Sequence, residues 1–258
     1  MSADIPISTK WTLDASGALG RIAIESVFLI KATKTHMKGT GFLLSSGHII
    51  TNEHVVRGNS STDIIAISSI GKDIHFTNSI IDAARDLAIL FPSEIIKGGL
   101  NLGDETKMNV SQMVMTWGYP LGYNGPPPLL SVGYLAGFKN TQNNSKAIKH
   151  LVVNGAFNPG NSGGPLFLAG NNEVIGVVVS KHAPMTKFQK EALGVLGQNR
   201  SGVVFTATDE TGKVIKFVES QLVAEILNYF REMTQVMIGE AISSNILKEF
   251  LSEHQIKY

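Results

Sequence analysis

Residues 158–167 read NPGNSGGPLF and place Ser162 among three glycines and two prolines. Glycine allows a backbone with positive φ and a close approach of another group, and it weakens a regular strand or helix. The stretch is therefore predicted to be a shaped loop that presents a hydroxyl group. A Gly-rich surface loop without chemistry has a similar composition, so the decision depends on whether the chain supplies a base for Ser162.

Short β-type runs separated by turn residues extend on both sides of this loop, from Arg21 to about Thr206. They are rich in Val, Ile, Leu, Phe and Thr and are bounded by Gly, Asn, Pro or Ser. Examples are RIAIESVFLI, GTGFLLSS, HIITNEHVV, LAIL, MVMTWGY, HLVVNGAF, EVIGVVVS and GVVFTAT. No long segment with helical periodicity interrupts them, which predicts an all-β sandwich or a pair of barrels.

The pattern changes to a helical period near residue 216. In VESQLVAEILNYFREM the apolar residues fall on one helical face. A second amphipathic run covers 236–251, with an apolar stripe made of Ile238, Ile242, Ile246, Leu247, Phe250 and Leu251. We therefore predict two C-terminal helices. The favoured interpretation is that the second helix packs on the barrels, and the alternative is that it docks an activating protein partner.

Composition excludes several classes of function. The net charge is +1 over 258 residues, so no nucleic-acid partner is expected. Cysteine is absent, and there is neither an HExxH motif nor a Cys/His cluster, so no metal and no other cofactor are expected. The N-terminus lacks the pattern of a signal peptide, and no apolar run reaches the ~20 residues that span a bilayer. We therefore expect a cytoplasmic protein without a membrane partner.

A serine nucleophile needs a base within hydrogen-bond reach and a third group that orients the base. His54 is the candidate base because it follows the apolar run GTGFLLSSGHIITNE, although a core histidine would have the same setting. Asp86 is the candidate orienting group because it opens the apolar run DLAIL. A carboxylate in such a place needs hydrogen-bond donors, and an imidazole N–H is one. The competing carboxylates are Asp63, Asp73 and Asp82.

The three candidates follow one another in the order His54, Asp86, Ser162. This is the order of chymotrypsin-like enzymes, whereas α/β-hydrolases and subtilisins have different orders. The all-β pattern fits the first group and excludes the other two folds. Each signal is weak by itself, and their combination predicts a catalytic triad.

The segments GTGFLLSSGHIITNEHVV, DLAIL, GYPLG and NPGNSGGPLF followed by EVIGVVVS resemble the trypsin-like serine peptidases, and most closely the HtrA/Deg branch. The resemblance covers about residues 20–233. It implies an all-β fold of two six-stranded antiparallel β-barrels with C-terminal helices and with the active site between the barrels. We expect an N-terminal segment over 1–20, a first barrel over 21–105, a second barrel plus a C-terminal helix over 106–233, and a helical extension over 234–258.

The resemblance also implies roles for individual residues. His54 would be the general base and acid, Asp86 would hold the tautomer of His54, and Ser162 would attack the scissile carbonyl of a protein or peptide substrate. The backbone N–H groups of Gly160 and Ser162 would form the oxyanion hole. One such donor contributes about 3 kcal/mol to transition-state stabilisation.

Two features depart from the resemblance. Asn161 stands where digestive trypsins carry an aspartate that pairs with a freed N-terminal ammonium, so activation by N-terminal cleavage is not expected. The HtrA branch shares this asparagine and is controlled by loop ordering, which predicts that the segment 155–160 is disordered or misoriented at rest. Only 25 residues follow Met233, too few for the PDZ domain that HtrA proteins usually carry.

Substrate preference is inferred from the same resemblance. The primary specificity pocket would be lined by 155–157, with Ala156 at the position that is charged in trypsin, and by Val177, Val178 and Val179. This predicts cleavage after a small or medium apolar residue, and the three valines are expected to offer an exposed strand edge to the substrate. The alternative function is a catalytically silent binding or scaffold module. Such a module would lack a triad member or a glycine of the oxyanion hole, and none of these is missing.

Overall fold

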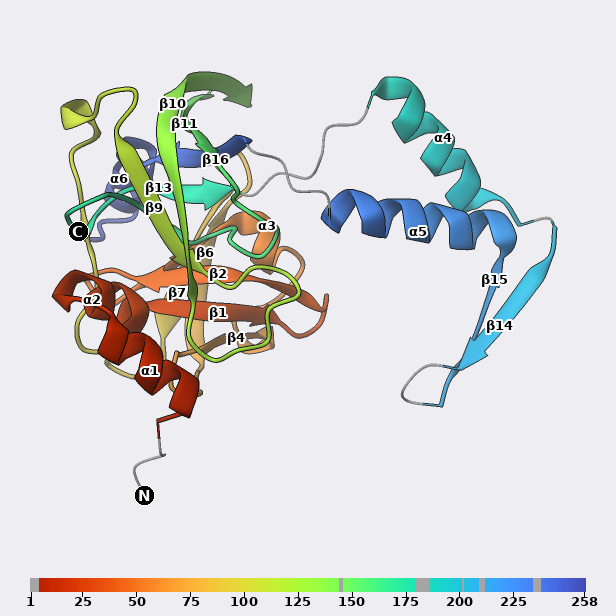
Figure 1. Ribbon diagram of the computed structural model, residues 1–258, viewed down its shortest axis with the longest axis horizontal. Helices are drawn as coiled ribbons and strands as arrows, with labels where there is room; N and C mark the ends of the chain where they lie inside the picture. Colours follow the sequence, from red (N-terminus) through yellow and green to blue (C-terminus); the bar gives the residue numbers. More distant parts are fainter. Residues whose placement is uncertain (1–4, 144–145, 180–185, 201, 209–211, 234–237) are drawn as a thin grey trace. The chain divides into compact units, whose positions relative to one another are not determined.

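The computed structural model describes residues 5–143, 146–179, 186–200, 202–208, 212–233 and 238–258 (Figure 1). The chain divides into two compact units. Unit 1 comprises Met1–Lys181 and Met237–Tyr258, and unit 2 comprises His182–Val236. The expected domain boundary lies between residues 233 and 234, with a helical extension after it. The residues from Met237 onward belong instead to unit 1, together with the two barrels.

Two short helices precede the first strand of unit 1. They are α1 (Ile7–Ala15) and α2 (Ala18–Ser26). The strand predicted from Arg21 is wrong for residues 21–26, since β1 begins only at Val27. The run RIAIES is short and half of its residues are apolar, and periodicity does not distinguish helix from strand in such short runs.

The first barrel is a seven-stranded antiparallel sheet with the order β5-β4-β1-β2-β3-β7-β6. The two strands at the ends of this order, β5 and β6, are separated only by His75, so the chain itself closes the sheet. Its apolar core includes Phe28, Ile30, Ile49 and Leu90. The strands are β1 (Val27–Ala32), β2 (Met37–Leu43), β3 (Ile49–Thr51), β4 (Ile64–Ile67), β5 (Asp73–Ile74), β6 (Phe76–Asp82) and β7 (Leu87–Pro92).

The second barrel closes through the pairing β12-β9-β10-β11-β16-β13-β12. A further short strand, β8, adds to β13 in parallel. These pairings confirm the two-barrel, all-β fold expected from the sequence. The strands are β8 (Asn101–Leu102), β9 (Met113–Gly118), β10 (Leu129–Asn143), β11 (Lys146–Gly155), β12 (Pro165–Leu168), β13 (Glu173–Val179) and β16 (Ile238–Ser243).

The C-terminal segment differs from the single helix predicted over 236–251. Its first part is the strand β16, which pairs with both β11 and β13, and only then does the helix α6 (Ser244–Glu253) begin. The isoleucines of this segment have a spacing compatible with one helical face, but pairing on both edges of β16 fixes it as a strand. Tertiary contacts here override the local pattern.

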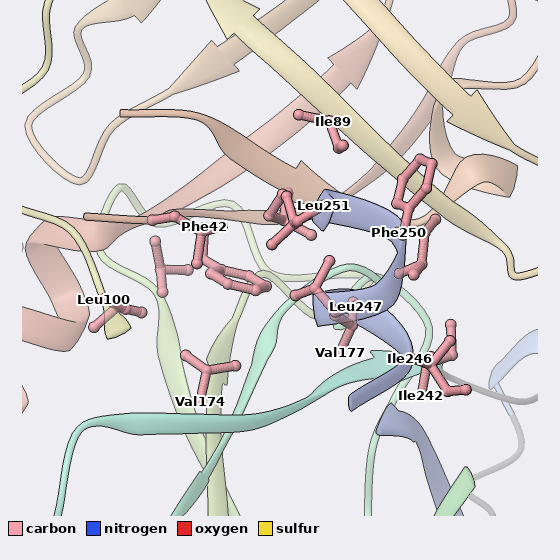
Figure 2. Close-up of a cluster of buried hydrophobic side chains, with 14 of the residues drawn as sticks. Phe42, Ile89, Leu100, Val174, Val177, Ile242, Ile246, Leu247, Phe250 and Leu251 are labelled. Carbon is pink, nitrogen blue, oxygen red and sulfur yellow. The ribbon is translucent and has the colours of Figure 1, made fainter. Parts of the chain in front are cut away.

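Helix α6 packs its apolar face into the core between the two barrels. Leu247, Phe250 and Leu251 are almost completely buried and lie among side chains of both sheets, such as Ile89 and Val177 (Figure 2). Five of the six residues of the apolar stripe are therefore covered by the chain itself, and Ile238, which lies before α6, is exposed. The prediction that this helix offers its stripe to an activating partner is wrong, and the interpretation that it packs on the barrels holds.

Unit 2 is inserted between β13 and β16. It contains α4 (Lys187–Gln198), the antiparallel hairpin β14 (Val204–Thr208) and β15 (Val214–Val218), and α5 (Glu219–Met233). The run GVVFTAT and the helix VESQLVAEILNYFREM, which are predicted to be part of the second barrel, belong instead to a separate unit. Across the described part of both units, no helix has the length and apolar character needed to cross a membrane.

Candidate active site

His54 and Asp86 are brought together from two neighbouring strands of the first barrel. His54 lies on the short helix α3 (Glu53–Val56) that follows β3, and Asp86 immediately precedes β7, which pairs with β3. The imidazole Nδ1 is 2.9 Å from Oδ1 and 2.8 Å from Oδ2 of Asp86. The backbone N–H of His54 also donates to Oδ1, at 2.9 Å. The carboxylate therefore orients both the ring and the backbone of His54.

Asp86 adopts a left-handed backbone conformation, with φ of 56°. This region is uncommon for residues other than glycine, although aspartate visits it more often than most. The side-chain amide of Asn52 donates to the backbone carbonyl of Asp86 at 2.9 Å and supports this conformation from the α3 side. The turn thus aims the carboxylate at His54 instead of continuing β7.

The serine loop consists of two successive turns. In the first, the N–H of Asn161 donates to the carbonyl of Asn158 at 3.0 Å, with Pro159 second and Gly160 third. In the second, the N–H of Gly164 donates to the carbonyl of Asn161 at 3.0 Å. The glycines at the third positions, Gly160 and Gly163, have φ of 95° and 85°. A proline followed by a glycine with positive φ is the signature of a type II turn.

The serine loop lies against the segment that carries His54. The N–H of Thr40 donates to the carbonyl of Ser162 at 2.8 Å. A Cβ atom at Gly39 would lie 2.6 Å from a methyl group of Val55 and 3.1 Å from that same carbonyl oxygen. Gly39 therefore permits the close approach of the serine loop to the residue that follows His54. Ser162 itself is 5% exposed, and His54 and Asp86 each retain 28% side-chain exposure.

The amide of Gly160 has a defined direction. The carbonyl of Pro159 accepts a hydrogen bond from the N–H of Leu121 at 2.6 Å. In a trans peptide the carbonyl and the following N–H point in opposite directions, so the N–H of Gly160 points away from Leu121. This hydrogen bond fixes the Pro159–Gly160 peptide, and the prediction that the segment 155–160 is misoriented at rest stays a prediction.

Thr40 is a residue that the sequence analysis missed. Its hydroxyl donates to the carbonyl of Gly160 at 2.7 Å and accepts from the N–H of Tyr119 at 3.0 Å, and it is fully buried. Together with the backbone bond to Ser162, it ties the first barrel to both turns of the serine loop. The motif GTGF contains the only available signal, a hydroxyl between two glycines.

We expect Thr40→Val to lower the free energy of unfolding by about 2 kcal/mol, because the substitution keeps the shape but leaves the buried N–H of Tyr119 and the half-buried carbonyl of Gly160 without their partner. Urea denaturation measures this. The matched control is Thr33→Val, since the Thr33 hydroxyl also donates to a backbone carbonyl but is exposed. Equal destabilisation by the two variants would contradict the bracing role of Thr40.

The expected substrate-binding residues are only partly where the sequence placed them. Ala156 is half-buried beside the serine loop. Val177 and Val178 are completely buried, and Val177 pairs with Pro165 on one side and Ile242 on the other. Val178 exchanges hydrogen bonds with Gly163 and Gly164. The prediction of an exposed edge at these two residues is therefore wrong, because β13 is an interior strand there.

Val179, the last residue of β13, keeps intermediate exposure and pairs with Glu240. It is the member of the valine run that remains a candidate for contact with a substrate. In the described part of the chain no group of His, Asp and Glu side chains is arranged to hold a metal ion.

Comparison with known proteins agrees with this geometry. The family model described as "Trypsin-like peptidase domain" matches residues 39–177, which is more than half of the chain. The chain belongs to the trypsin-like peptidase family. The family match begins next to Thr40 and contains His54, Asp86 and Ser162. The resemblance inferred from the sequence motifs is thereby confirmed.

Individual relatives point to the same family. A probable periplasmic serine endoprotease, DegP-like, from Pseudomonas putida is 32% identical over 140 residues, which cover 54% of this chain and 28% of that protein. The present chain thus spans less than a third of the length of this relative. The crystal structure of the Rv3671c protease from M. tuberculosis in its active form has a TM-score of 0.62 at 16% identity, covering 95% and 88% of the two chains. The HtrA-type protease AlgW with decapeptide has a TM-score of 0.59 at 17% identity, covering 91% and 65%.

Proposed function

We propose that this trypsin-like chain is a serine endopeptidase with the triad His54, Asp86 and Ser162. The observation that carries the proposal is the pairing of the His54 imidazole with both oxygens of Asp86, next to a serine loop built of two turns. A carboxylate on Nδ1 keeps the proton there and leaves Nε2 free to accept one. An orienting group, a base and a hydroxyl are the parts that nucleophilic catalysis by serine requires.

The proposed reaction runs in two steps. The hydroxyl of Ser162 loses its proton to Nε2 of His54 while its oxygen bonds to the scissile carbonyl carbon, and the imidazolium then gives the proton to the leaving amine as the C–N bond breaks. In the second step a water molecule gives its proton to His54 while its oxygen bonds to the acyl carbon. The bond to Ser162 then breaks, the serine oxygen takes the proton back, and the acid product is released. The developing oxyanion would be bound by the N–H groups of Gly160 and Ser162. The positive φ of Gly160 and the hydrogen bond that holds the Pro159–Gly160 peptide support this role for Gly160.

The finer properties stay predictions. Ala156 carries no charge, which supports a preference for a small or medium apolar residue before the cleaved bond. A requirement for an activating partner, and a cytoplasmic location, also stay predictions. The name of the DegP-like relative places that protein in the periplasm. The alternative function, a silent binding module, predicts a folded protein whose Ser162 does not react.

The test is labelling with a fluorophosphonate, in which the serine oxygen displaces fluoride from phosphorus. We expect one adduct by intact mass in the wild type and none in Ser162→Ala. An active-site adduct followed by cleavage of a denatured protein supports the endopeptidase. A folded wild type that forms no adduct, with or without peptide added, contradicts the proposal and favours the silent module.

A further inference from the structure

Arg85 is a buried cation directly beside Asp86. Only 4% of it is exposed, and its guanidinium lies 5.8 Å from the centroid of the Phe250 ring. One nitrogen, Nη1, donates to Oδ2 of Asp82 at 2.8 Å and to Oε2 of Glu253 at 2.7 Å, while Nη2 donates to Oε1 of Glu253. A buried guanidinium persists only where its donors are satisfied, so these contacts fix the position of Arg85.

Asp82 also closes the turn that leads into Asp86. Oδ1 of Asp82 accepts from the N–H of Ala84 at 2.9 Å and from the N–H of Arg85 at 3.1 Å. Its other oxygen holds the Arg85 side chain. Asp82 therefore fixes both the backbone and the side chain of the residue that precedes Asp86. Because Asp86 has positive φ, its carboxylate direction depends on how firmly this turn is held.

Glu253 occupies an unfavourable place in its helix. It is the last residue of α6, where the helix dipole favours cations over carboxylates. Hydrogen bonding to Arg85 lowers the pKa of Glu253 to about 2, and hydrogen bonding to Glu253 raises the pKa of Arg85. Lys146 is a further cation near this cluster, with its Nζ 3.8 Å from Glu253 and 4.0 Å from Asp82. The carboxylate of Glu253 is therefore stabilised by Arg85 and not by its own helix.

We propose that Arg85 and Glu253 are positioning residues that use the buried helix α6 to hold the Asp86 carboxylate against His54. Helix α6 supplies a fixed support, since Leu247, Phe250 and Leu251 anchor it in the core between the barrels. The guanidinium transmits that support to the turn over 82–86. This inference rests on the proposed function for its catalytic consequence, but its structural content concerns only the hydrogen bond between His54 and Asp86.

The test compares the variants Arg85→Met, Arg85→Lys and Glu253→Gln with the control Glu94→Gln. The control also removes a carboxylate from an ion pair, since Glu94 lies 2.8 Å from Lys72, but this pair is away from the triad. The first readout is the rate of fluorophosphonate labelling. Misplacement of a catalytic group by about 1 Å lowers the rate by up to about 10²-fold. We therefore expect the labelling rate to fall by about 10²-fold in Arg85→Met and by about tenfold in Glu253→Gln. Arg85→Lys keeps the charge and should recover part of the loss, and Glu94→Gln should label at the wild-type rate.

The second readout does not need an active enzyme. In a Ser162→Ala background, the proton on Nδ1 of His54 gives a low-field NMR resonance as long as it is hydrogen-bonded to a carboxylate. We expect this resonance in the Glu94→Gln control and its weakening or loss in Arg85→Met and Glu253→Gln. Thermal unfolding of each variant identifies any that fails to fold, in which case Glu253→Gln and Arg85→Lys carry the test.

The outcomes separate the two proposals. An unchanged resonance in both Arg85→Met and Glu253→Gln would overturn the positioning role whatever the activity. A wild type that shows the resonance but never forms an adduct would overturn the proposed function and leave the structural role of Arg85 intact. A labelling loss in Arg85→Met without any change in the resonance would also count against the inference.

Discussion

Replacing Asp86 with asparagine is expected to lower the rate of fluorophosphonate labelling at pH 7 by about 10⁴-fold, because it puts the imidazole in the wrong tautomer. In one orientation the new amide NH₂ takes the place of Oδ2, which lies 2.8 Å from Nδ1, and donates to it. The proton then moves to Nε2, which can no longer accept one from Ser162. In the flipped orientation the NH₂ takes the place of Oδ1, which accepts from the backbone N–H of His54 in the wild type. Two donors then face each other, so this orientation is unfavourable.

The control for this experiment is Asp73→Asn, which changes an exposed carboxylate that the sequence alone offered as a competitor. It should label at the wild-type rate. Circular dichroism and thermal unfolding check that both variants are folded. If Asp86→Asn stays within about tenfold of the wild type, the orienting role assigned to Asp86 fails, since an amide that merely accepts from Nδ1 would be sufficient.

Replacing Gly163 with alanine is expected to destabilise the protein by about 3 kcal/mol or more. Two costs add: the positive φ of 85° strains any residue with a Cβ, and the Cβ would overlap the carbonyl oxygen of Thr40 and the hydroxyl of Thr51. Both neighbours belong to the first barrel and cannot move without breaking strand pairs. Urea denaturation gives the free energy of unfolding.

Gly170 offers a matched control. It has φ of 93°, and a Cβ there would have no atom within 4 Å. Gly170→Ala should therefore cost only the strain of the backbone, about 1 kcal/mol. The difference between the two variants measures the contact between the serine loop and the first barrel. Equal values would mean that the loop adjusts freely and that the close approach at Gly163 is not a constraint.

Much of the candidate site could be predicted because its signals are local. Pro159 and Gly160 determine a turn within four residues, and the apolar runs around His54 and Asp86 mark the strands that carry them. Arg85, Glu253 and Thr40 carry no comparable signal. The partner of Arg85 on α6, Glu253, lies 168 residues away, and the hydroxyl of Thr40 meets a carbonyl 120 residues away. No local pattern reports contacts at such separations.

The fold divides in the same way. The β-type runs predicted an all-β chain, and the motifs predicted two barrels. The periodicity of 238–243 nevertheless predicts a helix, although this segment pairs with β11 and β13. The resemblance implies an exposed edge at Val177 and Val178, although both edges of β13 are hydrogen-bonded there, to strands or to the serine loop. Both errors have one cause, because the edge or interior place of a strand depends on the partners that the rest of the chain brings to it.

The sequence by itself determined the turns around Ser162, the order of the three candidate residues and the all-β character of the barrels, since each of these depends on backbone preferences and periodicity over a few residues. Only the tertiary structure decided that residues 182–236 form a separate unit, that β16 completes the second barrel, and that α6 supports the turn at Asp86. These features depend on which distant surfaces exclude water together and which distant donors and acceptors meet.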